Sequence, residues 1–223
     1  MSVPAPLVVP IFATPFGVLT LPRADETNGA LLDLLRSRAT AKWHDPGAAP
    51  GALVFRSRED LCEWPDEPAR LVTQSMLAAV SAVAASVNQF TPERFAALRV
   101  QARAWFTIVH PDGCVPSANY PNGSWLAVYC VAAPAPSATR FDSGVLRLHE
   151  SRYGTMFPDA TNSDTVMPYR PGHSTWRPVP GQVAVFPACV THEVALVRSV
   201  GELVLVTARV RYVGSEQTGV PWW

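Results

Sequence analysis

The chain has 223 residues, of which 48% are hydrophobic, so it is long enough to bury a sizeable core. Its 18 Lys and Arg residues balance its 18 Asp and Glu residues, which excludes a general electrostatic attraction to nucleic acid or to an anionic membrane surface. We therefore expect the partner to be a small-molecule substrate or another protein. The four cysteines form no C-x-x-C pair, which indicates a reducing, cytoplasmic compartment and no cysteine metal knuckle.

The N-terminal part of the chain predicts edge strands followed by a helix. Residues 7–21 are rich in β-branched and aromatic side chains but are interrupted by prolines, which is typical of edge strands. The start of the chain lacks a basic segment and a long apolar segment, so we expect no secretory signal. A helix is predicted to begin at Asp25 or Thr27 and to end near 44–46, since a residue before proline avoids helical dihedral angles.

A short strand and two further helices are predicted before residue 100. The strand has the sequence ALVF at 52–55. An apolar helix from about 68 to 87 should pack on a sheet, because its large apolar residues recur at helical spacing. Thr91 is a good N-cap and is followed by Pro92 at the first helical position, so another helix is expected there.

From about residue 102 the chain consists of short apolar segments separated by turn residues. The predicted strands cover 102–109, 124–132, 144–150, 174–179, 182–188, 192–197 and 202–213. Two cysteines in apolar runs, Cys130 and Cys189, should be buried thiols. A helical part over about 24–100 followed by a β core over about 102–213 predicts one α+β domain over 1–223, whose sheets form a sandwich or a barrel.

Two segments have no clear periodicity. The long segment 151–173 is typical of a functional lid, and its Met156, Phe157, Tyr169 and His173 favour a partly apolar substrate. The chain ends in Trp222 and Trp223, which either form a subunit contact, as in a homodimer, or belong to a frayed end.

His192 is the best-placed candidate for a metal ligand. It follows a strand that ends in Phe-Pro and a short turn, and it opens the next strand, so its side chain should project from a rigid framework. The alternative is a surface histidine or one whose hydrogen bonds are satisfied within the fold. A second candidate is the His110-Pro111-Asp112 sequence at the end of strand 102–109. Two histidines and one carboxylate can form a facial triad that leaves coordination positions open on iron(II). The alternative for His110 and Asp112 is an ordinary turn, because Pro-Asp-Gly is a strong turn sequence.

The last strand supplies candidate arginines. Period-two alternation places Arg209 and Arg211 on one face with Leu203, Leu205 and Thr207. An arginine that faces the mouth of a barrel could hold a carboxylate bidentately. The alternative is that both arginines lie in solvent near the end of the strand.

Several blocks resemble a bacterial family of 2-oxoglutarate/Fe(II)-dependent oxygenases. They are PIFATPFGVLTLP with the NGALLDLL helix, PNGSWLAVYCV, DSGVLRLHESR and PGQVAVFPACVTHEV, and together they span nearly the whole chain. The resemblance implies a double-stranded β-helix (jelly-roll, cupin-like) core with helices packed on the major sheet, and it aligns His192 with the distal metal ligand. It also implies Fe(II) and 2-oxoglutarate as cofactors of a dioxygenase that hydroxylates or desaturates a small-molecule or peptide-type substrate.

The chain departs from the family pattern at three positions. Ala118 and Tyr120 stand where the family has its H-x-H pair, and Glu202 opens the last strand where the family has arginine. In our main interpretation His110, Asp112 and His192 bind the iron, and Arg209 or Arg211 binds the 2-oxoglutarate carboxylate.

The departures also support two other interpretations. In one, iron chemistry is lost, and His192, Tyr120 and Tyr129 serve as acid, base or hydrogen-bonding groups of a metal-independent isomerase, cyclase or lyase, or of a binding module. In the other, a different metal site uses His192, His149 or His110, and water.

Overall fold

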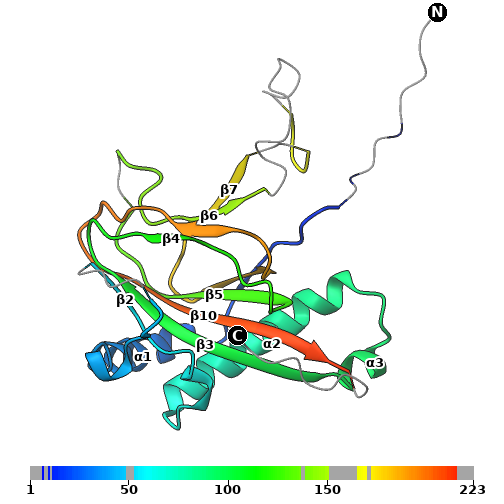
Figure 1. Ribbon diagram of the computed structural model, residues 1–223, viewed down its shortest axis with the longest axis horizontal. Coiled ribbons are helices and arrows are strands. Elements are labelled where there is room, and N and C mark those ends of the chain that lie inside the picture. Colours follow the sequence, from blue (N-terminus) through cyan, green and yellow to red (C-terminus); the bar gives the residue numbers. More distant parts are fainter. Residues whose placement is uncertain are drawn as a thin grey trace, which may run out of the picture.

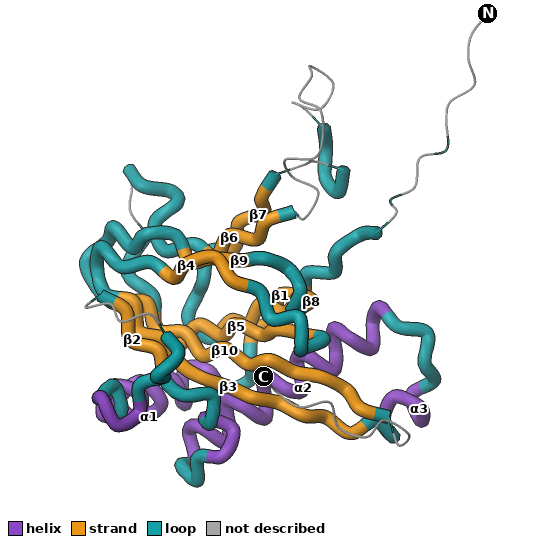
Figure 2. Tube along the Cα trace, viewed as in Figure 1, coloured by secondary structure: helices purple, strands orange, loops and turns teal. Residues whose placement is uncertain are grey.

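Two antiparallel sheets face each other, and helices cover the outer side of the larger sheet (Figures 1 and 2). The computed structural model describes residues 7, 10, 12–48, 53–136, 139–150, 165–169 and 172–214. The major sheet has the strand order β1-β8-β5-β10-β3-β2, and the minor sheet has the order β4-β9-β6-β7. This arrangement is the double-stranded β-helix that the family resemblance implied, with helices on the major sheet.

The strands of the major sheet are β1 (Gly17–Thr20), β2 (Val54–Arg56), β3 (Arg99–Val109), β5 (Trp125–Ala132), β8 (Gln182–Pro187) and β10 (Leu203–Val213). The strands of the minor sheet are β4 (Val115–Ala118), β6 (Leu146–His149), β7 (His173–Trp176) and β9 (His192–Val194). The α-helices are α1 (Ala24–Ser37), α2 (Glu67–Val87) and α3 (Pro92–Ala96), and the 3₁₀ turns are η1 (Ala41–Trp43) and η2 (Leu61–Glu63).

Strand β10 is the centre of the fold, because it pairs with β3 on one side and with β5 on the other. The side chains of β10 alternate between the two layers. On the helical side, Val204, Val206, Ala208 and Val210 join the larger hydrophobic cluster. Leu203 and Leu205 join the smaller cluster between the sheets, on the side that Thr207, Arg209 and Arg211 share by alternation. The predicted common face is therefore confirmed, and both arginines on it are buried rather than solvated.

The helices pack on the outer side of the major sheet through one apolar face each. Leu31 and Leu35 of α1, one helical turn apart, have no exposed surface. Helix α2 buries residues at similar spacing, including Val72, Met76 and Val80, against the sheet. By length and hydropathy alone α2 could also cross a membrane, but a core helix of this kind meets the same criterion. The predicted helix at 68–87 is confirmed.

Some local predictions need correction. Helix α1 begins at Ala24, after Arg23 in a left-handed conformation, and ends at Ser37, with the η1 turn filling the predicted remainder. The third helix does begin after Thr91, whose hydroxyl accepts a hydrogen bond from the Arg94 N–H. Cys130 is buried as expected, but Cys189 is exposed because it lies in the turn after β8. The tail 215–223 and most of the segment 151–173 lie outside the described residues.

Candidate functional site

His192 lies between the two sheets at the start of β9. It pairs with Ala118 of β4 and with Leu148 of β6, and only 9% of its surface is exposed. Its Nδ1 atom is 3.0 Å from the Val190 carbonyl oxygen. A carbonyl can only accept a hydrogen bond, so we assign the ring proton to Nδ1 and a free lone pair to Nε2.

The environment of His192 keeps its imidazole neutral. Burial lowers its pKa, the Val190 hydrogen bond partly offsets this, and the nearby His149 lowers the pKa further. Within the described part of the chain, Nε2 has no hydrogen-bond partner. His192 therefore presents an unprotonated nitrogen that can accept a proton or bind one metal ion.

Tyr120 lies next to this imidazole. Its backbone N–H donates to the Ala188 carbonyl at 2.8 Å, and its ring centroid is 5.9 Å from that of His192. Burial raises the pKa of the Tyr120 phenol, and the nearby Arg56 lowers it in part, so the phenol is a neutral hydrogen-bond donor. No residue in the described ranges hydrogen-bonds to its Oη atom.

Aromatic rings extend from this pair in both directions. Trp105 of β3 is 5.1 Å from Tyr120, and Phe186 of β8 is 5.3 Å from His192, measured between ring centroids. Phe16, which precedes β1, stacks on Phe186 at 6.1 Å. These five rings form an aromatic row that can contact a flat or apolar molecule.

A network of four charged groups borders the row. Glu59 accepts a hydrogen bond from Arg56 Nη2 at 2.8 Å through Oε1 and from Arg209 Nη2 at 2.7 Å through Oε2. Asp45 Oδ2 is 3.4 Å from Arg56 Nε. The guanidinium carbon of Arg56 lies 4.5 Å from the centroid of the Trp105 ring, and that of Arg209 lies 5.5 Å from the centroid of the Tyr120 ring.

His110 and Asp112 do not join this site. The His110 side chain is 41% exposed, and its Nδ1 atom lies 3.3 Å from Glu202 Oε1, while Asp112 has a positive φ of 62° in the turn after β3. The turn interpretation is therefore correct for both. His110 follows Val109, which pairs with Leu203 at the start of β10. Tyr120 contacts Arg209, which lies six residues, or about 20 Å, further along β10 than Leu203. The structure does not bring His110 and Asp112 to His192.

The remaining sequence candidates lie in different places. Arg211 shares the inner face with Arg209, and its Nε donates to Gln101 Oε1 at 2.7 Å. Tyr129 faces the helices instead, where its hydroxyl donates to Asn28 Oδ1 at 2.5 Å and burial raises its pKa to about 12. Tyr129 therefore lies on the opposite face of the major sheet from Trp105 and Phe186, which belong to the cluster between the sheets.

Six residues of the site were not predicted from the sequence: Phe16, Asp45, Arg56, Glu59, Trp105 and Phe186. Period-two alternation in β2 would have placed Arg56 on the inner face, since it pairs with Thr107 of β3. Nothing in the sequence around Glu59 indicates that its carboxylate reaches Arg209, 150 positions later in the chain.

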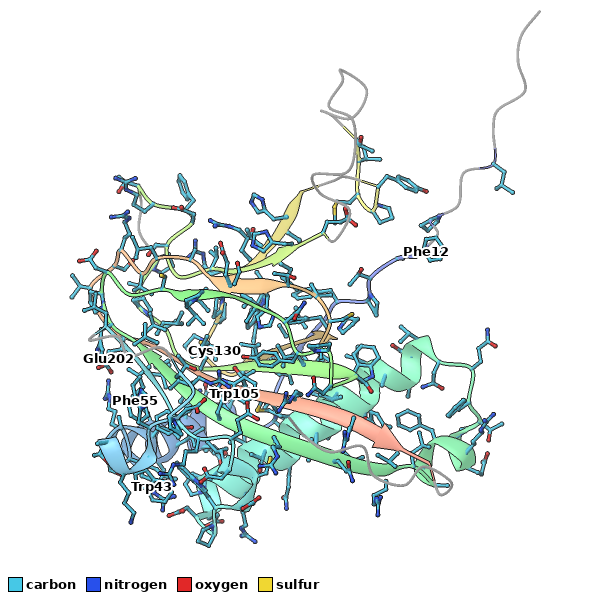
Figure 3. All side chains as sticks on the ribbon, viewed as in Figure 1. Phe12, Trp43, Phe55, Trp105, Cys130 and Glu202 are labelled. Carbon is cyan, nitrogen blue, oxygen red and sulfur yellow. The ribbon has the colours of Figure 1, made fainter. Side chains whose placement is uncertain are left out.

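The site does not fit an iron(II)–2-oxoglutarate centre of the family type. His192 supplies one nitrogen, but the positions of the proximal ligands hold the Ala118 methyl group and the Tyr120 phenol. Among the described residues, no group of three or more His, Cys, Asp or Glu side chains could hold a metal ion. Glu202, at the position of the family arginine, pairs with Arg36 of α1 and lies away from Trp105 (Figure 3).

Comparison with known proteins supports the fold assignment. Neither a family model nor a curated protein matches the sequence. A Pseudomonas putida prolyl-4-hydroxylase structure matches with a TM-score of 0.55 and 19% identity, over 90% of this chain and 94% of that one. The non-haem alpha-ketoglutarate-dependent carbocyclase SnoK from nogalamycin biosynthesis matches with a TM-score of 0.59 and 12% identity, over 91% of this chain and 81% of that one.

An oxidoreductase of the 2OG-Fe(II) oxygenase family from Burkholderia pseudomallei matches with a TM-score of 0.50 and 15% identity, over 88% of this chain and 84% of that one. At identities this low the shared property is the arrangement of the strands and helices. The chain therefore has the double-stranded β-helix fold of the 2-oxoglutarate/Fe(II) oxygenases.

Proposed function

We propose that this chain is a metal-independent acid–base enzyme built on an oxygenase fold. Its substrate is a small molecule bound between the two sheets, and its reaction belongs to the isomerase, cyclase or lyase class. The observation that carries the proposal is the pairing of a neutral His192, with Nε2 free among the described residues, and a neutral Tyr120 phenol on adjacent rings. This pair stands where the resemblance places metal ligands.

The two side chains have complementary roles in such a reaction. His192 Nε2 takes a proton from a carbon beside a carbonyl group of the substrate. Tyr120 Oη donates a hydrogen bond to the carbonyl oxygen as negative charge develops there. Return of the proton to a different carbon completes an isomerisation. Burial has the largest effect on the pKa of Tyr120 and raises it; Arg56 and Arg209 lower this pKa in part, and Glu59 and Asp45 raise it.

The structural neighbours are compatible with this chemistry. SnoK is described as a carbocyclase, so the fold can position a substrate for ring closure. A preorganised acid–base pair between two rigid sheets meets the same geometric requirement without a metal. Fold alone does not determine the reaction, so the proposal depends on the two side chains.

Proton exchange tests the proposal without knowledge of the natural substrate. Chelator-treated protein is incubated in D₂O with a panel of aromatic and aliphatic ketones, and NMR follows deuterium at the carbons beside the carbonyl. We expect exchange by the wild type, a loss of about 10²-fold or more in His192→Gln, and a smaller loss in Tyr120→Phe. Equal rates for all three proteins would contradict the proposal.

Metal titration tests the competing oxygenase function. We expect no stoichiometric iron in the purified protein and no charge-transfer absorption when iron(II) and 2-oxoglutarate are added without oxygen. A charge-transfer band together with succinate formation in air would overturn the proposal and restore the iron-dependent interpretation.

A further inference from the structure

The carboxylate of Glu59 lies between two arginines as a bound ligand would. Each of its oxygens accepts a hydrogen bond from one guanidinium group, at 2.8 Å from Arg56 and at 2.7 Å from Arg209. The arginines come from β2 and β10, on opposite sides of β3, and both extend from the inner face of the major sheet. Such a pair is suited to planar, charge-assisted recognition of a carboxylate.

The protein backbone fixes the two arginines more firmly than it fixes Glu59. The guanidinium groups lie against the Trp105 and Tyr120 rings. A methyl group at Gly123 would come within 2.6 Å of the Arg209 Cγ atom, so the loop at 123 packs closely on the arginine stem. Glu59 extends from the segment between β2 and η2, outside any strand or helix, and its side chain is 23% exposed. Solvent and ligands can therefore reach its carboxylate.

We propose that Arg56 and Arg209 form a carboxylate subsite, and that Glu59 is an internal plug that a substrate carboxylate displaces. This inference rests on the proposed function and adds the substrate class, an aromatic or apolar monocarboxylate. Glu59 places a single carboxylate between the two guanidinium groups, so the subsite is suited to one ligand carboxylate.

The position of the subsite fits the acid–base pair. Arg209 contacts Tyr120, and Tyr120 contacts His192, so a carboxylate held by the arginines directs the rest of the molecule along the aromatic row. The reacting carbon then lies within reach of His192 Nε2.

The test measures binding of 3-phenylpropionate, of its uncharged amide and of 2-oxoglutarate by calorimetry, in the presence of EDTA. The proteins are the wild type, Glu59→Ala, Glu59→Gln and a control, Glu63→Ala, whose exposed side chain has no ion pair among the described residues. We expect Glu59→Ala to bind the carboxylate about tenfold or more tightly than the wild type, because it no longer competes with an internal carboxylate. The amide should bind all four proteins equally, and adding Arg209→Met to Glu59→Ala should abolish the gain.

Three other binding results would overturn the inference. If Glu59→Ala and the wild type bind the carboxylate with equal affinity, or if neither binds it, Glu59 does not compete with a ligand for the two arginines. If Glu59→Ala gains as much affinity for the amide as for the carboxylate, the gain is steric and does not depend on the charge of the ligand. If 2-oxoglutarate gains affinity and 3-phenylpropionate does not, the subsite serves a keto acid and the assigned substrate class is wrong. If Glu59→Ala does not fold, Glu59→Gln carries the test, with a smaller gain expected. Loss of proton exchange with a retained carboxylate gain would refute the acid–base function and leave the subsite intact.

Discussion

Glu59→Ala should destabilise the protein more than Arg209→Met, although both substitutions break the same ion pair. Glu59 accepts charge-assisted hydrogen bonds from two arginines, and each such bond contributes roughly 1.5–3 kcal/mol. The Arg209 side chain is 9% exposed and would lose its ion pair with Glu59, whereas Arg56 would keep its ion pair with Asp45. We therefore expect the free energy of unfolding to fall by about 2–4 kcal/mol in Glu59→Ala.

Arg209→Met retains most of the packing of the long side chain and leaves Glu59 paired with Arg56, so its loss should be about 1 kcal/mol. Urea unfolding followed by circular dichroism and tryptophan fluorescence measures both values and that of the double variant. Because the two side chains interact, the double variant should lose less than the sum of the single losses. A loss in Glu59→Ala smaller than that in Arg209→Met would refute the view that Glu59 neutralises both arginines.

Three further predictions concern single side chains. The pKa of His192 is lowered in the folded protein, so below about pH 6.5 the unfolded chain binds the His192 proton more tightly than the folded chain does. The free energy of unfolding should therefore fall as the pH drops. In urea titrations at several pH values, His192→Gln should show a weaker dependence on pH than the wild type. Tyr129→Phe removes the bond to Asn28 and should cost about 1 kcal/mol of stability in the same assay, with no change in carboxylate affinity by calorimetry. Gly123→Ala should displace Arg209, with a cost of about 1–3 kcal/mol, and should weaken carboxylate binding although no charge changes; unchanged affinity would argue against the arginine subsite.

The sequence predicted the parts of the fold where periodicity is strong. Period-two alternation placed Arg209 and Arg211 correctly, and helical periodicity located α2 to within one residue at its start. Strand β4 was missed because it has four residues and contains Pro116, which is tolerated at the edge of the minor sheet.

The candidate site was less predictable, since it depends on which strand ends meet. Tyr129 belongs to a strand that is buried on both faces, so alternation does not indicate whether it faces the helices or the other sheet. The grouping of His110 and Asp112 with His192 was wrong because it assumed that they lie at the same end of the sheets. Only the register of β10 with β3 shows that the His110 end is remote from Tyr120.

The alternation along β10 separates two kinds of evolutionary constraint within one strand. Its even-numbered residues, Val204 to Val210, hold the helical layer in place, and a polar substitution there would threaten folding. Its odd-numbered residues face the other sheet, where Thr207 and Arg209 can be exchanged without disturbing the helices. Substitutions on one side of the strand can therefore change the side chains of the site while the packing on the other side stays unchanged.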